Sequence, residues 1–337
     1  METLALAGMA EAAHPRAMKD STALNADLAP GPLAVAISRV KLLLALSRTP
    51  HGLLDLAAPA VAALLWLGRL PPLATTALGL LTVFAGYTAV YALNDLVDCR
   101  VDREKLRLQG GPGANYYLDA VFLRHPLAAG RVSLPEGVLW TGAWALTALL
   151  GAYCLNPACA LIFLAGCLLE TTYCLLLRVS HLRLLVAGVV KSLGAVAAVL
   201  AVDPRPSPWF MAVLFLWLFF WELGGQNIPA DWHDLEQDTH LHAKTIPVVY
   251  GPEKARFMAM GFLSLSLVFS LVVLHMSPAR ISVFEQLLVL GGGIFLLLLP
   301  AWGLLRSGAR GQAATLFNRA SYYPLAVLAV VLLSLAV

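Results

Sequence analysis

The feature that most constrains the fold of this chain is a succession of apolar segments, each about as long as a membrane is thick. A helix needs about 20 mostly apolar residues to cross a bilayer. Nine segments approach or reach that length, at residues 52–70, 74–96, 135–155, 157–177, 182–202, 207–227, 254–276, 283–305 and 318–337. Pro and Gly lie in several of the connections, as is typical of turns. The sequence therefore predicts an all-α, polytopic membrane protein with nine transmembrane helices.

The amino-acid composition excludes an ordinary soluble domain. Of the 337 residues, 59% are hydrophobic and 13% are charged, whereas soluble domains average about 45–50% and about 25%. The net charge of +3 is too small to indicate a nucleic-acid partner. The chain begins with a stretch rich in Ala, Pro and Asp that does not resemble a signal peptide. We expect residues 1–45 to be a poorly ordered cytosolic extension and residues 46–337 to be the nine-helix domain.

Basic residues are distributed unevenly between the two sides that nine spans define. Nineteen of the 23 lie on the side of the N-terminus, three lie on the opposite side, and Lys191 lies inside a span. Because basic loops stay in the cytosol, we expect the N-terminus there and the C-terminus outside. Both long connections, 97–134 and 228–253, then face the cytosol.

The five cysteines show no metal-binding spacing. Cys154 and Cys159 flank a short connection, so a disulfide between them is one possibility. Two small buried residues are the other, because free Cys usually behaves as a small hydrophobe.

Two acidic clusters stand at the ends of apolar segments on the expected cytosolic side. They are Asp95, Asp98 and Asp102 in the first triplet, and Asp231, Asp234 and Asp238 in the second. Each triplet has the spacing i, i+3 and i+7, which places three side chains on one face of a helix. The sequence therefore predicts two acidic helix faces of matched spacing.

Carboxylates this close together repel, and the repulsion grows near a membrane. Mg²⁺ is the natural cation to offset it, because Mg²⁺ binds a few carboxylates together with water and phosphate oxygens. Two such faces predict two ions around one diphosphate. The alternative is a pair of solvated charged loops, but matched spacing on one side of the membrane favours a metal site.

These motifs resemble the UbiA superfamily of intramembrane prenyltransferases. The first family pattern, NDxxDxxxD, is complete at residues 94–102. The second family pattern, DxxxD followed by a Lys-Thr pair, is similar to Asp234, Asp238, Lys244 and Thr245. The family stretch that follows the first motif is similar to "HPLAAGR", with His125 in place of an Arg. The resemblance covers about residues 45–337. It implies nine helices around a central cavity, Mg²⁺ as cofactor, and transfer of an isoprenyl chain from its diphosphate to a small-molecule acceptor.

The chain departs from the family pattern in two places. The connection between Asp102 and His125 is longer than usual and contains "GGPGANYY". It is either a lid that closes over the site or a variable loop. In the second motif, Gln237 and the pair Thr239-His240 stand where the family often has Gly and a basic pair. This leaves the diphosphate contacts there open.

The motifs and the resemblance together suggest roles for eleven residues. Catalytic roles fall to Asp98, Asp102, Asp234, Lys191 and Tyr173, metal binding to Asp95, Asp98, Asp102, Asp231, Asp234 and Asp238, and diphosphate binding to Asn94, Arg178, Lys191 and Lys244. A basic residue inside a span marks function by default. For Lys191 the alternatives are snorkelling to a headgroup or an ion pair with Glu170 or Glu222. For Tyr173 the alternative to contacting acceptor or cation is ordinary packing.

The residues leave the acceptor open. The resemblance favours an aromatic ring of the 4-hydroxybenzoate or quinone-precursor type, in a bacterial plasma membrane with the site facing the cytosol. Alternatives on the same fold are a lipid or sugar phosphate, a porphyrin, or cyclisation of the isoprenoid itself. A cation transporter is the rival outside enzymes, but its charges would lie near the bilayer midplane, whereas these lie at the ends of spans.

Overall fold

The computed structural model describes residues 32–108 and 123–336 of the chain. The chain separates into two compact units, Met1–Val40 and Lys41–Val337. Helix α1 (Pro32–Leu46) is the described part that begins in the first unit. Most of the extension expected at residues 1–45, and most of the "GGPGANYY" connection, lie outside the described residues. All the membrane-length helices belong to the second unit.

Helices account for nearly all of the described part of the second unit, which contains no strand. They are α2 (Thr49–Asp55), α3 (Ala57–Leu67), α4 (Leu73–Leu108), α5 (Leu134–Leu155), α6 (Pro157–Leu175), α7 (Arg183–Val202), α8 (Pro208–Trp221), η2 (Glu222–Asn227), α9 (Ile228–His233), α10 (Leu235–His240), α11 (Ile246–Tyr250), α12 (Pro252–Met276), α13 (Val283–Gly293), η3 (Ile294–Leu298), α14 (Leu299–Ser307), α15 (Arg310–Ser321) and α16 (Tyr323–Ala336). Several pairs continue one another, so that nine stretches within the described residues are long and apolar enough to cross a membrane.

The nine predicted spans are confirmed, with most ends moved by a few residues. The second span shows the largest difference, because helix α4 runs on from residue 96 to Leu108 through the acidic stretch. The last span begins at Arg310 instead of residue 318. Hydropathy marks the apolar part of a helix and not the polar turns that extend it, which explains both differences.

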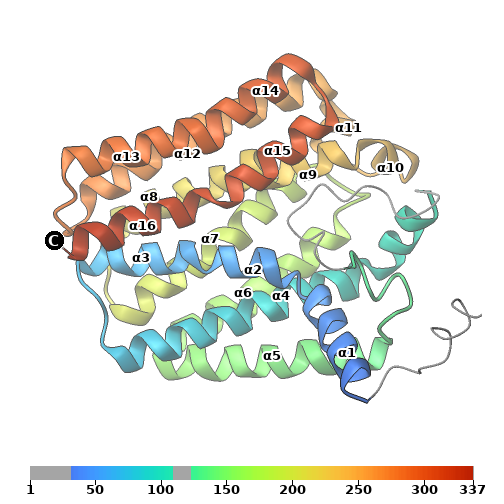
Figure 1. The fold of residues 1–337 in the computed structure, drawn as a ribbon, viewed down its shortest axis with the longest axis horizontal. Helices are drawn as coiled ribbons and strands as arrows, with labels where there is room; N and C mark the ends of the chain where they lie inside the picture. The colour runs from blue at the N-terminus through green and yellow to red at the C-terminus, as the bar shows by residue number, and fades with distance from the viewer. Residues whose placement is uncertain (1–31, 109–122, 337) are drawn as a thin grey trace, which may run out of the picture. The chain divides into compact units, whose positions relative to one another are not determined.

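The largest apolar core lies among α3, α7, α8, α12 and α16. Trp217, Trp221 and Tyr323 are its largest fully buried side chains. Trp221 Nε1 donates to the carbonyl of Ala320 at 2.9 Å, and the Tyr323 hydroxyl lies 2.6 Å from Ser270 Oγ. Figure 1 shows α16 beside α3, with α13 on its other side.

The segment that follows α8 departs from regular helix before it reaches the second triplet. The stretch η2 is π-helical, a conformation that is frequent at functional sites. It packs closely on α12, since a Cβ added at Gly224 would lie 2.8 Å from the carbonyl oxygen of Ala259. Helix α9 then ends, and Asp234 leaves the helical region with φ −90° and ψ 8°. The spacing of the second triplet predicted one continuous helical face. This prediction is wrong, because the chain turns at Asp234.

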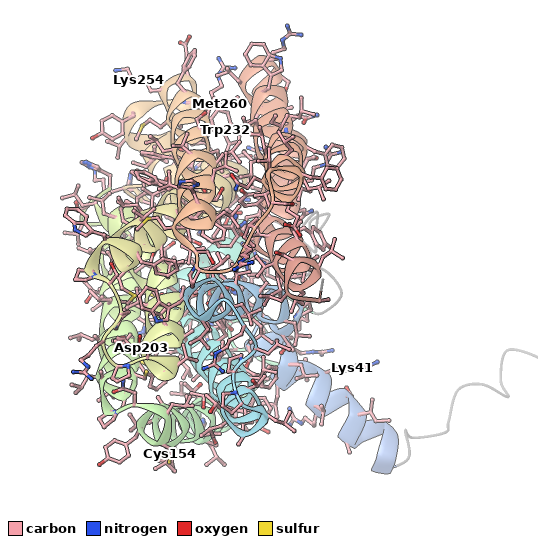
Figure 2. All side chains as sticks on the ribbon, turned by 90° about the vertical axis from the view of Figure 1, so that its left-hand side faces the viewer. Lys41, Cys154, Asp203, Trp232, Lys254 and Met260 are labelled. Atoms are coloured by element: carbon pink, nitrogen blue, oxygen red, sulfur yellow. The ribbon has the colours of Figure 1, made fainter. Side chains whose placement is uncertain are left out.

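Cys154 and Cys159 are both free cysteines. Cys154 lies at the end of α5, near the edge of the view in Figure 2, and its side chain is exposed. Cys159 is buried, and its Sγ lies 3.2 Å from the carbonyl oxygen of Ala197. The two cysteines are therefore not paired, and the expectation of two small buried residues is confirmed for Cys159 and wrong for Cys154.

Candidate active site

The first acidic triplet lies near the C-terminal end of α4, where the chain is still helical. Asp95 and Asp102 are buried, and Asp98 is half-buried. His125 Nδ1 lies between the two buried carboxylates, 2.9 Å from Asp95 Oδ1 and 2.8 Å from Asp102 Oδ2. Burial opposes the charged imidazole, but the two carboxylates outweigh it and raise the pKa of His125 above its usual value. The imidazole therefore lies against two carboxylates of the triplet, and its positively charged form is favoured there.

The backbone of His125 has a φ of +52°, in the left-handed region that a non-glycine residue rarely adopts. Its neighbour Pro126 starts a turn in which the amides of Arg131 and Val132 both donate to the Pro126 carbonyl. Strained backbone of this kind is found where the surrounding structure fixes it, often at functional sites. The turn therefore holds the imidazole against α4.

The second triplet lies on α9, on α10 and on the turn between them, and all three of its carboxylates are buried. Lys105 Nζ lies 3.3 Å from Asp234 Oδ2 and 2.8 Å from Asp238 Oδ1, and Arg124 lies 3.2 Å from Asp234 Oδ2. Burial raises the pKa of Asp238. At Asp234 the charges of Arg124 and Lys105 outweigh burial and hold the pKa well below its usual value. Asp234 is therefore ionised at neutral pH.

The two triplets meet at one end of the helix bundle. Lys105 belongs to the same helix as the first triplet and contacts two members of the second. Arg183, at the start of α7, lies 3.4 Å from Asp231 Oδ1 and also interacts electrostatically with Asp98 and Asp238. In Figure 1 the C-terminal part of α4 lies at the same end of the bundle as α9 and α10. The carboxylates thus line a single site.

Asn94 is held by Arg48, which directly precedes the first span, and by Glu170 of another span. Arg48 donates to its Oδ1 at 3.0 Å, and its Nδ2 donates to Glu170 Oε1 at 2.7 Å. Arg48 has a φ of +44°, so it is a second strained residue at this site. An Asn with both ends of its amide bonded has a fixed orientation, which suits a residue that must present an oxygen or an N–H to a ligand.

Tyr173 lies beside the second triplet. Its hydroxyl accepts a hydrogen bond from Asn227 Nδ2 at 3.0 Å, and the Arg183 guanidinium lies 3.9 Å from its ring centroid. Since Arg183 also pairs with Asp231, the Tyr173 ring supports a cation of the site.

The other predicted basic residues lie apart from the triplets. Lys191 Nζ lies 2.6 Å from Asp55 Oδ2 and 4.0 Å from Glu222 Oε2. Arg178 is exposed and pairs with Glu104 of α4. The Lys244 side chain is exposed, while its backbone amide donates to the Leu177 carbonyl at 2.6 Å. Arg178 and Lys244 therefore stand at the rim, and Lys191 lies inside the bundle.

The carboxylates retain unused capacity for a hard divalent cation. Asp95 Oδ2, Asp234 Oδ1 and Asp238 Oδ2 are buried and have no hydrogen-bond partner among the described residues. A carboxylate oxygen of Asp95 and one of Asp102 can lie within 4.8 Å of one another. Carboxylate oxygens are the protein ligands that Mg²⁺ prefers. The residues present therefore fit Mg²⁺.

An apolar pocket of about 350 Å³ lies among α3, α4, α5, α6 and α7, with α16 on one side. Tyr87 and Val90 of α4 line it on the side of the triplets, and Thr75 lines it toward the other end of the same helix. Residues 75 and 90 are about 22 Å apart along the helix axis at about 1.5 Å per residue. The pocket is therefore long and suits an extended hydrocarbon.

Sequence reasoning missed several members of the site, namely Arg48, Lys105, Arg124, Glu170 and Arg183. Lys105 carried a usable signal, because it follows Asp98 by seven residues and so continues the acidic face of α4. The others reach the site from different spans and connections, and their spacing along the chain does not reveal that they meet there.

Comparison with known proteins agrees with this arrangement. The sequence profile of the UbiA prenyltransferase family matches residues 56–323. No curated protein matches the sequence. Three solved structures are similar in fold. An apo UbiA homologue from Aeropyrum pernix K1 has 21% sequence identity and a TM-score of 0.64, and the match covers 84% of this chain and 97% of that one. A UbiA homologue from Archaeoglobus fulgidus bound to GPP and Mg²⁺ has 20% identity and a TM-score of 0.62, with 88% and 100% covered, and a digeranylgeranylglyceryl phosphate synthase has 16% identity and a TM-score of 0.63, with 89% and 100% covered.

The fold is thus that of an integral membrane protein of the intramembrane prenyltransferase class. Because the family profile covers most of the sequence, the chain belongs to the UbiA prenyltransferase family.

Proposed function

We propose that this protein transfers an isoprenyl chain from its diphosphate to a small-molecule acceptor with an aromatic ring, as in quinone biosynthesis. The observation that carries the proposal is the meeting of two acidic triplets, buried except for the half-buried Asp98, at one end of a long apolar pocket. A charged head and a hydrocarbon tail are the two parts of an isoprenyl diphosphate. The site offers a matching environment for each part.

Asp95, Asp98 and Asp102 would hold one Mg²⁺, and the second triplet would hold another. When bound there, Mg²⁺ would supply positive charge that offsets the charge developing on the departing diphosphate. Lys105, Arg124 and Arg183 add protein cations at the same place, where they act on the same developing charge.

The residues around the triplets have supporting roles in this proposal. Asn94 orients the diphosphate, and the exposed Arg178 and Lys244 attract it at the rim. The aromatic face of Tyr173 stabilises positive charge. The apolar walls of the pocket exclude water from the allylic cation.

We also propose that the N-terminus and the triplets face the cytosol and that the C-terminus lies outside, as the distribution of basic residues favours. A reporter enzyme that works only outside the membrane, fused after Val337, should be active. Activity of a cytosol-only reporter at that position would contradict this orientation.

The function is tested by transfer assays on the purified protein with labelled farnesyl and geranylgeranyl diphosphates, with and without Mg²⁺, against a panel of acceptors. Asp98→Asn and Asp234→Asn should each lower transfer by about 100-fold or more. Asp203→Asn is the matched control, because Asp203 lies at the end of α7 opposite Arg183 and pairs with Trp66. Full transfer by both site variants would overturn the proposal.

A further inference from the structure

A second buried polar cluster lies deeper in the bundle than the triplets. It consists of Lys191 on α7, Asp55 on α2, Tyr91 on α4 and Glu222 on η2. Lys191 Nζ lies 2.6 Å from Asp55 Oδ2, donates to the Tyr91 hydroxyl at 3.2 Å, and lies 4.0 Å from Glu222 Oε2. The Tyr91 hydroxyl donates to Asp55. The Lys191, Asp55 and Glu222 side chains are 10%, 2% and 13% exposed.

A purely structural ion pair does not account for this cluster. Burying charge in a membrane protein is costly, and Lys191 with Asp55 would already form a satisfied pair between two spans. Glu222 adds a second carboxylate whose Oε2 has no hydrogen-bond partner among the described residues. The buried Tyr87 hydroxyl is likewise without a partner there. One carboxylate oxygen and one hydroxyl are therefore left to form hydrogen bonds with a ligand.

The cluster lies between the triplets and the apolar pocket. Tyr91 precedes Asp95 by one helical turn, and its ring stacks on that of Tyr87 at 6.3 Å. Tyr87 and Val190, the neighbour of Lys191, line the pocket. Along α7, Lys191 lies about 12 Å from Arg183 at about 1.5 Å per residue. A donor with its head at the triplets and its tail in the pocket would carry its first isoprene unit past this cluster.

The charges of the cluster select among acceptors. One lysine and two carboxylates give it a net charge of −1 when Asp55 and Glu222 are ionised and His51, which lies 3.9 Å from Asp55, is neutral. Like charges placed together in a desolvated site repel strongly and weaken binding. A carboxylate or phosphate on the acceptor would be repelled in this way, whereas a neutral hydroxyl can donate to Glu222 and accept from Tyr87.

We propose that Lys191, Asp55, Tyr91 and Glu222 form the acceptor subsite and that this subsite takes a neutral hydroxyl-bearing acceptor, a phenol or an alcohol, in preference to a ring acid or a phosphate ester. The inference rests on the proposed prenyl transfer. It admits an alcohol beside an aromatic ring as acceptor, it disfavours the hydroxybenzoate type among aromatic acceptors, and it assigns Lys191 to the acceptor instead of the diphosphate.

Transfer at this subsite breaks one bond of the donor, forms one bond to the acceptor and moves one proton. The allylic C–O bond of the donor breaks, and its electron pair leaves with the diphosphate. The hydroxyl oxygen of the acceptor, or the ring carbon beside it, forms the new bond to the first isoprenyl carbon. The proton lost from that oxygen or carbon passes to the Glu222 carboxylate. No oxidant or further reactant is required.

The test compares matched acceptors, 1-naphthol against 1-hydroxy-2-naphthoate and dodecanol against dodecyl phosphate, with saturating donor and Mg²⁺. Wild-type protein should prenylate a neutral member of these pairs at least about tenfold faster than its anionic partner. Glu222→Gln, which keeps size and shape, should lower kcat for the neutral acceptor by about 100-fold and leave Mg²⁺-dependent donor binding unchanged. Glu253→Gln, an exposed carboxylate at the start of α12, is the matched control.

A second variant tests the charge argument without relying on loss of activity. Asp55→Asn combined with Glu222→Gln changes the cluster from −1 to +1, so relative use of the anionic acceptor should rise by about tenfold or more. Faster use of the anionic acceptors by wild-type protein, or no effect of Glu222→Gln on kcat, would overturn the inference while donor binding stays intact. Loss of Mg²⁺-dependent donor binding in the wild-type protein would instead overturn the proposed function.

Discussion

At the scale of single residues, Lys105 joins the two halves of the site. It lies on the helix of the first triplet, and its ammonium group contacts both Asp234 and Asp238 of the second. With Arg124 it balances the negative charge of two buried carboxylates. In this arrangement the protein supplies part of the positive charge that a metal ion would otherwise provide.

Lys105→Met should lower thermal stability in EDTA, because it leaves the buried Asp238 carboxylate without its closest cation and removes one of two cations from Asp234. The expected cost is about 2 kcal/mol, below the full cost of breaking a buried ion pair, because Arg124 remains on Asp234. Added Mg²⁺ should then raise the melting temperature of the variant more than that of the wild type. Arg310→Met, which removes the exposed pair with Glu236, should change neither value measurably. An equal Mg²⁺ response in Lys105→Met and wild type would count against a metal site at Asp234 and Asp238.

The aspartates could be found from the sequence, but their partners could not. The spacing i, i+3 and i+7 is local, and an apolar segment before it reveals that the carboxylates stand at the end of a span. Arg48 and Arg183 lie more than 45 residues from Asn94 and Asp231, their respective partners. Only the packing of distant spans brings such pairs together.

At the scale of secondary-structure elements, the π-helical stretch η2 links the two polar regions. It begins at Glu222, in the deeper cluster, and ends at Asn227, which bonds Tyr173 beside the second triplet. Its close packing on α12 and α7 fixes the direction in which Glu222 points. A run of hydropathy values cannot predict this element, because hydropathy carries no information about hydrogen-bond register. The break at Asp234 was missed for the same reason.

Gly224→Ala should disturb this element through packing. Its Cβ would lie 2.8 Å from the Ala259 carbonyl oxygen, a backbone atom that cannot rotate away. Overpacking of this kind costs about 1–3 kcal/mol, so the melting temperature of the detergent-solubilised protein should fall and transfer should fall with it. Gly261→Ala on α12 meets nothing within 4 Å and should leave the melting temperature unchanged or raise it. If both variants melt alike, close packing does not hold η2 in place.

At the scale of the whole transmembrane unit, charge and hydrocarbon environments are separated along the helix axes. The triplets lie at one end, the Lys191 cluster lies next, and the apolar pocket extends toward the other end. Apolar length alone was enough to predict the spans within the described residues. It could not predict the pocket, which forms where small residues of several helices leave space.

The depth of the pocket should set the donor length that the protein accepts. Gly79 lines the pocket on the turn after Thr75, and a Cβ there meets nothing within 4 Å. Gly79→Leu should therefore project into the pocket and slow transfer from a C20 donor relative to a C10 donor by about tenfold. Gly142→Leu, on an exposed position of α5 with equal free space, should not change that ratio. An unchanged ratio in Gly79→Leu would show that the tail lies elsewhere.

The central claim is that both triplets grip one diphosphate through divalent cations. The most direct measurement is titration of the purified protein with a non-hydrolysable isoprenyl diphosphate analogue, with Mg²⁺ and in EDTA. We predict binding that requires Mg²⁺ and that Asp98→Asn and Asp234→Asn each weaken by about tenfold or more. Binding of equal strength in EDTA, or in both variants, would contradict the account.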